Sequence, residues 1–82
     1  MLDIYYFAGY RERLGVDRER VAWQPELASV GQLRQWLVAR GGAWSELAAS
    51  NLMCARNQEL CGLEQALCDG DEIAFFPPVT GG

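Results

Sequence analysis

The last two residues, Gly81 and Gly82, have no side chains, and the only reactive group there is the α-carboxylate of Gly82. With a pKa of about 3.3–3.7, this carboxylate is ionised at neutral pH and is a poor electrophile. It becomes an acyl donor only after activation, for example by adenylation with ATP. Because neither residue has a Cβ, the tip fits a narrow channel and lets catalytic groups approach the carbonyl. The ending therefore suits an activated acyl or thioacyl carrier, although a terminal Gly-Gly can also be a plain chain end.

Two prolines, Pro77 and Pro78, precede this tip and stiffen the chain in an extended form. A six-residue tail over residues 77–82 spans about 20 Å at most. We therefore expect a folded domain over residues 1–76 and an extended Gly-Gly tail over residues 77–82.

The three cysteines, Cys54, Cys61 and Cys68, are the other residues with chemistry to consider. They stand seven residues apart, form no C-x-x-C pair and have no histidine to help them. A zinc site takes about four nitrogen or sulfur ligands, so we predict no metal site. The odd number of cysteines indicates free, buried or half-buried thiols in a reducing cytoplasm.

The composition limits the possible partners. The chain has 82 residues, 50% of them hydrophobic, which is typical of one small globular domain. Its net charge is −4 and all seven of its basic residues are arginine. An acidic domain has little with which to neutralise phosphates, so neither nucleic acid nor an anionic membrane is an expected partner. No apolar run approaches the ~20 residues of a membrane-spanning helix.

The helices and strands that must position the tail are predicted from the spacing of hydrophobic residues and from the residues that begin and end helices. The capping-box sequence from Ser29 to Gln32 predicts a main helix that runs to about Arg40 and ends before Gly41-Gly42. Its expected buried face is Val30, Leu33, Trp36 and Leu37. Shorter helical segments are expected at residues 10–14, closed by Gly15, and at residues 43–49. Strands are expected at residues 2–8, 18–24, 52–56, 60–61 and 72–76.

This order of elements indicates an α+β fold in which one main helix packs across a mixed sheet. It is the β-grasp, or ubiquitin-like, arrangement, with the first and last strands side by side in the middle because they are the most apolar. We expect Asp69, Asp71 and Glu72 to form a solvated turn and strand start, and Arg56 to point outward or lie at an edge. The three tryptophans are expected to pack in or beside the core.

The C-terminal run from Asp69 to Gly82, which ends Phe-Phe-Pro-Pro-Val-Thr-Gly-Gly, resembles the MoaD-type small subunits of molybdopterin synthase. These subunits are ubiquitin-like sulfur carriers. The resemblance extends along the chain through Phe7-Ala8, Arg11-Glu12, Gly15 and Asn57-Gln58.

The resemblance implies a mechanism. A ubiquitin-activating-like adenylyltransferase adenylates Gly82 with ATP and magnesium, and a donor of the cysteine desulfurase or rhodanese type supplies sulfur. The resulting thiocarboxylate enters the active site of the large synthase subunit and donates sulfur to cyclic pyranopterin monophosphate, which forms the molybdopterin dithiolene. This chain would bind no cofactor and supply no catalytic base. It would be a non-catalytic subunit of a cytoplasmic enzyme complex, usually a heterotetramer.

A docking surface is expected beside the tail. If Ile4 and Tyr6 face the main helix, the alternate residues of the same strands face outward. Exposed aromatic side chains are a natural partner patch. The expected interface residues are Phe7, Arg11 (at the rim), Leu60 and Phe76, with Tyr5 beside them, followed by Pro77, Pro78, Val79 and Thr80 of the tail.

Two other classes of function remain open. One is a sulfur carrier for thiamine synthesis or tRNA thiolation, which would share the fold and the Gly-Gly end. The other is a ubiquitin-like protein modifier or a plain interaction module, which would deliver no sulfur.

Overall fold

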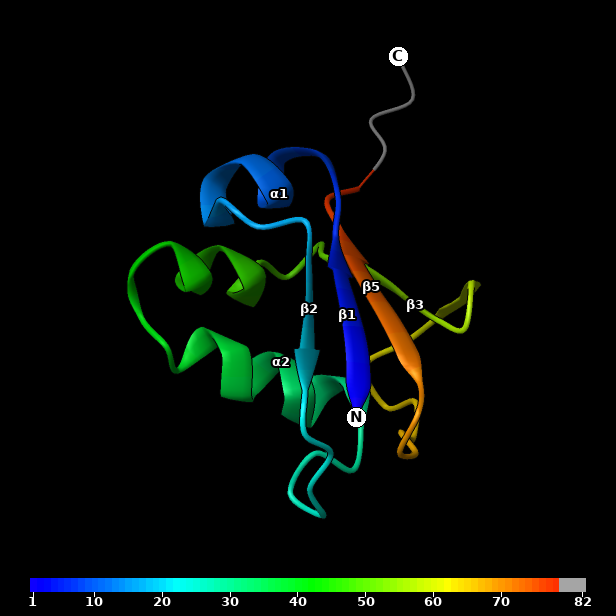
Figure 1. Cartoon of the computed structure of the whole chain (residues 1–82). Helices are drawn as coiled ribbons and strands as arrows, with labels where there is room; N and C mark the ends of the chain where they lie inside the picture. Colours follow the sequence, from blue (N-terminus) through cyan, green and yellow to red (C-terminus); the bar gives the residue numbers. More distant parts are fainter. Residues whose placement is uncertain (79–82) are drawn as a thin grey trace.

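The computed structural model describes residues 1–78. Its centre is a five-stranded sheet in the order β2-β1-β5-β3-β4, with one main helix, α2, across one face (Figure 1). Strands β1 and β5 are parallel neighbours in the middle, and the other pairs are antiparallel. The predicted β-grasp arrangement is thereby confirmed.

The strands are β1 (Leu2–Tyr6), β2 (Arg18–Val21), β3 (Met53–Arg56), β4 (Glu59–Cys61) and β5 (Glu72–Phe76). The helices are α1 (Ala8–Leu14), α2 (Val30–Val38) and the 3-10 helix η1 (Gly42–Ala48).

Three predicted strands are shorter in the structure, although β3 differs only by beginning at Met53 instead of Leu52. β1 ends at Tyr6, because α1 already begins at Ala8, two residues earlier than expected. β2 ends at Val21 rather than Gln24. The register explains this, since Val21 pairs with Leu2, the residue at which β1 begins, and no strand is left for residues 22–24 to pair with.

Helix α2 starts as its sequence predicts. The backbone N–H of Gln32 donates to Ser29 Oγ at 3.2 Å, which satisfies one of the unpaired donors of the first turn. The glutamine side chain contacts the serine hydroxyl rather than completing the capping box. The helix ends at Val38, two residues before the expected end at Arg40.

The predicted buried face of α2 is right at Val30, Leu33 and Leu37, all fully buried, and wrong at Trp36. Trp36 is 39% exposed. Its ring lies 4.9 Å from the guanidinium of Arg40, so it covers the end of the helix instead of the sheet.

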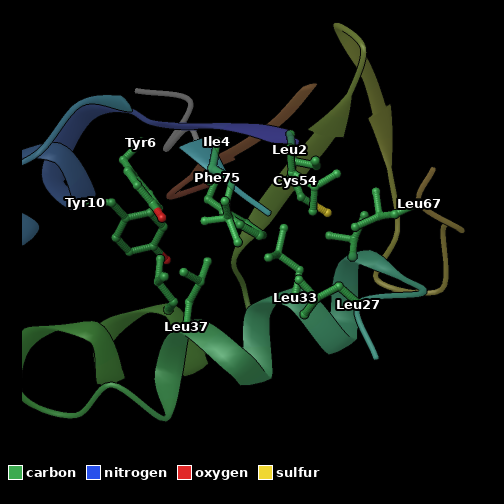
Figure 2. Close-up of a cluster of buried hydrophobic side chains, with 14 residues drawn as sticks. Leu2, Ile4, Tyr6, Tyr10, Leu27, Leu33, Leu37, Cys54, Leu67 and Phe75 are labelled. Atoms are coloured by element: carbon green, nitrogen blue, oxygen red, sulfur yellow. The ribbon is translucent and has the colours of Figure 1, made fainter. Parts of the chain in front are cut away.

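The core lies between the sheet and α2, as Figure 2 shows. Its side chains come from alternate positions of β1 and β5 and from the helices, and one end is filled by Tyr6 and Tyr10. The largest fully buried residues are Tyr6, Phe75, Leu2, Ile4, Leu27, Leu33, Leu37, Leu47, Ile73 and Val30.

A polar chain fastens the sheet to the end of α2. The hydroxyl of Tyr6 donates to Glu19 at 3.1 Å, and Arg40 donates to both oxygens of the same carboxylate at 2.8 and 3.0 Å. Trp44 packs edge-on against Tyr6 and lies 4.4 Å from the Arg40 guanidinium. Burial, together with the negative charge of Glu19, raises the pKa of Tyr6 far above its ordinary value, so the hydroxyl remains a donor.

The expectations for Asp71 and Arg56 are both wrong. Asp71 is only 6% exposed, and its carboxylate accepts from Arg56 Nε at 2.8 Å, the Cys68 N–H at 2.8 Å and the Asn57 amide at 3.2 Å. Arg56 shares a face of β3 with buried Cys54, and β3 is not an edge strand. The two partners are 15 residues apart in the chain, so no local pattern could pair them. Asp69 is exposed, as expected.

This network predicts a specific loss of stability in acid. Burial alone would raise the pKa of Asp71, but the hydrogen bonds from Arg56, Cys68 and Asn57 outweigh it and lower the pKa. A carboxylate with a depressed pKa stabilises the fold above its unfolded value of about 3.9 and loses that effect as the pH falls further. We expect Asp71→Asn to be less stable than the unsubstituted protein at pH 7 and to lose less on acidification. Urea unfolding at pH 7 and pH 3 measures this, with the exposed Asp17→Asn as control; parallel acid curves for the parent and Asp71→Asn would contradict it.

Candidate functional site

The end of β5 leads toward the predicted tail. Phe76 is its last residue, and Pro77 and Pro78 follow half-buried. The Phe7 N–H donates to the Phe75 carbonyl at 3.1 Å, which holds this end of β5 against the start of α1 (Figure 1). The predicted tail residues Val79, Thr80, Gly81 and Gly82 lie outside the described residues.

The face of the sheet opposite α2 carries a groove. Its lining includes Tyr5, Phe7 and Phe76, so the predicted outward orientation of these aromatic side chains is confirmed. The cavity volume is about 460 Å³. Leu60, 70% exposed, stands opposite Ala55 in the register of β3 and β4. The full lining is Tyr5, Phe7, Ala55, Gln58, Glu72, Ala74 and Phe76.

Arg11 is not among these residues. It is exposed on α1 and lines a separate hollow with Glu12, Gly15, Val16 and Asp17. The cation beside the aromatic face is Arg18, whose guanidinium lies 5.5 Å from the centre of the Tyr5 ring. Sequence reasoning missed Arg18 because its place next to Tyr5 depends on the pairing of β1 with β2.

At the other end of this face, the two carboxylates of Asp3 and Glu72 differ in their cationic partners. Asp3 lies between two arginines, with Arg20 Nε at 3.1 Å and Arg18 at 4.0 Å from its carboxylate. Glu72 stands next to Asp3 in the parallel register of β1 and β5. Within residues 1–78, Glu72 forms no ion pair, so its carboxylate remains available to an incoming cation.

The cysteines differ in burial. Cys54 is buried and Cys61 half-buried, as expected, whereas Cys68 is exposed, which corrects the prediction for that residue. Cys54 and Cys61 face each other in the register of β3 and β4, with their sulfur atoms 3.9 Å apart. Burial, reinforced by the neighbouring Cys61, raises the pKa of Cys54 to about 12. Cys54 is therefore a neutral core thiol at physiological pH.

An alkylation experiment checks this assignment. The thiolate is the reactive form of cysteine, and a pKa of about 12 leaves almost none at pH 8. We expect iodoacetamide to label exposed Cys68 in the native protein and to leave Cys54 unmodified until the chain unfolds. Peptide mass spectrometry of a time course, with a urea-unfolded sample as control, follows each site; early labelling of Cys54 would refute the assignment.

The described residues offer no other chemical centre. Among residues 1–78 there is no cluster of three or more His, Cys, Asp or Glu side chains that could hold a metal ion. In the same part of the chain, no helix combines the length and hydrophobicity needed to cross a membrane. The site therefore consists of the end of β5, where the chain leaves the sheet, and the apolar groove beside it.

Comparison with known proteins points the same way. The sequence matches the ThiS family over residues 4–82. It is 43% identical to the molybdopterin synthase sulfur carrier subunit of Haemophilus influenzae and 42% identical to that of Escherichia coli, each over 100% of both chains.

Solved structures share the fold. The crystal structure of SAMP1 from Haloferax volcanii has a TM-score of 0.80 and 31% identity, and the match covers 99% of this chain and 98% of that one. A protein–protein complex of subunits 1 and 2 of molybdopterin-converting factor from Helicobacter pylori contains a chain with a TM-score of 0.68 and 24% identity. That match covers 99% of this chain and 97% of the Helicobacter chain.

Proposed function

Because this chain belongs to the ThiS family, we propose that it is the sulfur carrier subunit of a molybdopterin synthase, with Gly82 as the residue that carries the sulfur. The observation that carries this proposal is the 42–43% identity along the complete length of two proteins named for that role. The Gly-Gly ending and the described exit of β5 agree with it, since a carrier needs a thin tip on a firmly held base.

The chemistry begins with activation of the Gly82 carboxylate. A ubiquitin-activating-like adenylyltransferase joins it to AMP from ATP, with magnesium, and pyrophosphate leaves. A donor of the cysteine desulfurase or rhodanese type carries the sulfur as a cysteine persulfide, whose outer sulfur attacks the carbonyl carbon and displaces AMP. A second thiol then attacks the donor's cysteine sulfur, which forms a disulfide and releases the outer sulfur on Gly82. The product is a C-terminal thiocarboxylate. Its sulfur is the more nucleophilic end of an anion that is stable in water, so it can attack cyclic pyranopterin monophosphate directly. Water then hydrolyses the bond between the Gly82 carbonyl and the sulfur, so the sulfur stays on the pterin and Gly82 returns to a carboxylate.

The residues of this chain supply position rather than catalysis. Gly81 and Gly82 enter a narrow channel in the large subunit because they have no Cβ atoms. Pro77, Pro78, Val79 and Thr80 span the distance between that channel and the sheet. Phe7, Leu60 and Phe76 form the apolar contact that holds the carrier on the surface of its partner.

The partner in sulfur delivery is a second, larger subunit. The Helicobacter pylori neighbour is a complex of subunit 1 with subunit 2 of molybdopterin-converting factor, and the two bacterial relatives are named as subunits. We propose the same pairing here, in a heterotetramer within the cytoplasm. Each partner uses the carrier in turn, because the adenylyltransferase and the large subunit must both receive Gly82.

A protein modifier is the second candidate function. The Haloferax volcanii neighbour at 31% identity is named small archaeal modifier protein 1. A modifier would join Gly82 to target lysines through isopeptide bonds. This chain contains no lysine, so it could not accept further copies of itself.

The intact mass of the protein from cells with an active cofactor pathway distinguishes these functions. The sulfur carrier predicts a fraction heavier by one oxygen-to-sulfur exchange, localised to the peptide that ends in Gly82. The modifier predicts isopeptide adducts on target proteins and no such exchange. A tail that remains an ordinary carboxylate, even with the activating enzyme and a sulfur donor supplied, would overturn the carrier assignment.

A further inference from the structure

The groove on the face of the sheet opposite α2 has a central depression over Ala55 and Ala74, which we call the Ala55–Ala74 hole. One row of side chains crosses all five strands, because the register pairs Arg18 with Tyr5, Tyr5 with Ala74, Ala74 with Ala55, and Ala55 with Leu60. The two central members are alanines, whereas their neighbours in the row, Tyr5 and Leu60, are large. The surface is therefore depressed where β5 and β3 meet.

The neighbouring rows close the hole on its other sides. Toward the end of β5, Phe76 pairs with Met53, and both present apolar side chains. Toward its start, Glu72 and Gln58 complete the lining. The result is an apolar floor with aromatic walls and one carboxylate at the rim. Pockets of this form accept the anchor residues that dominate the binding energy of protein interfaces.

We propose that the Ala55–Ala74 hole is the anchor pocket of the carrier, and that it takes one bulky apolar side chain of the large subunit that receives Gly82. A lysine or arginine beside that side chain pairs with Glu72. This inference rests on the proposed function and specifies which residues of the sheet decide partner recognition.

The position of the hole supports this occupant. Ala74 is two residues before Phe76, the end of β5, and residues 77–82 extend about 20 Å at most from there. A protein that holds Gly82 in its active site must therefore lie within about 20 Å of this end of the sheet. The groove lined by Phe7 and Phe76 is an apolar surface within that reach, and the proposal is that the partner buries it in the act of receiving the tail.

The charge of the face supports the cationic neighbour. Asp3 is already neutralised by Arg18 and Arg20, whereas Glu72 has no cationic partner within residues 1–78. A carboxylate at an apolar rim loses its hydration when a partner covers it, so a bound state without a cation would be unfavourable. Glu72 therefore selects against partners that lack a basic residue at this point.

Filling the hole tests the proposal. Ala74→Leu places a larger side chain on the floor, and we expect its affinity for the purified large subunit to fall roughly 30-fold or more, as for other central anchor pockets. Ala43→Leu makes the same change at an exposed position of η1 and should bind as the parent does. Isothermal titration calorimetry measures all three proteins, and circular dichroism checks that each is folded.

Glu72→Gln provides a second, independent variant that preserves the size of the rim. It should bind more weakly than the parent and show a smaller loss of affinity between low and high salt, because one ion pair is absent. If Ala74→Leu does not fold, this salt comparison decides the question. Equal binding by Ala74→Leu and Ala43→Leu, or an unchanged salt dependence in Glu72→Gln, would overturn the proposal.

An incorrect anchor pocket and an incorrect function would give different experimental results. If the unsubstituted protein forms the thiocarboxylate and binds the large subunit but filling the hole changes nothing, only the anchor pocket is wrong. If the unsubstituted protein does not bind the large subunit at all, the proposed function itself is wrong.

Discussion

Adding one alanine after Gly82 is expected to abolish sulfur transfer while leaving the domain as stable as before. The added residue moves the carboxylate one residue further out and places a Cβ where the channel accepts none. Activation and sulfur delivery both act on the terminal carboxylate, so a single displacement disables both steps. No thiocarboxylate should appear in the intact mass, and a reconstituted synthase should form no dithiolene product.

The control for this experiment is an alanine inserted before Met1, which lengthens the chain equally at its other end. It should retain full activity. A plain interaction module would tolerate both extensions equally well. Full sulfur transfer by the Gly82-extended protein would therefore remove Gly82 from the mechanism, whatever the affinity for the large subunit.

Phe75→Ala is expected to have the largest effect on stability. Phe75 is fully buried and packs against the ring of Tyr6, with 6.4 Å between ring centres. Truncating a core phenylalanine costs about 3–5 kcal/mol, through lost burial and the cavity that remains. The total stability of native domains is only about 0.05–0.15 kcal/mol per residue, which is about 4–12 kcal/mol for 82 residues. The variant should therefore lose a large share of its stability and unfold at a much lower urea concentration. Urea unfolding of parent and variant gives the difference directly.

Its neighbour Phe76 provides a matched control. The two phenylalanines are adjacent in β5 but point to opposite faces, and Phe76 lines the outer groove. Phe76→Ala should cost little stability and should weaken binding of the large subunit instead. The pair thus separates folding from recognition. Equal losses of stability in both variants would contradict the assignment of the two faces of the sheet.

The sequence was sufficient wherever a feature depends on residues close together in the chain. Alternation along β1 and β5 correctly separated buried Ile4 and Phe75 from outward-facing Tyr5 and Phe76, because side chains in a strand point alternately to opposite faces. Ser29 began α2 as its capping sequence predicts. Gly15 ended α1 with a left-handed φ of 72°, which glycine adopts at little cost.

The sequence was insufficient where long-range geometry decides a residue's surroundings. Trp36 fits a helical apolar face by spacing, yet the structure turns its ring toward Arg40 at the end of the helix. Asp71 reads as a turn residue, yet Arg56 and Asn57 reach it from another strand and loop and bury it. Cys68 resembles the other two cysteines in spacing but is exposed.

By itself, the sequence determined the kind of fold and predicted the chemistry that we propose for Gly82, because periodicity, capping and a glycine pair are properties of neighbouring residues. Only the tertiary structure decided what surrounds the exit of the chain. The hole between Ala55 and Ala74 exists because the register of β3 and β5 sets two small side chains opposite each other. A slip of one residue in that pairing would move every side chain of the strand to the other face. Recognition by this protein therefore depends on strand register, which no short stretch of sequence records.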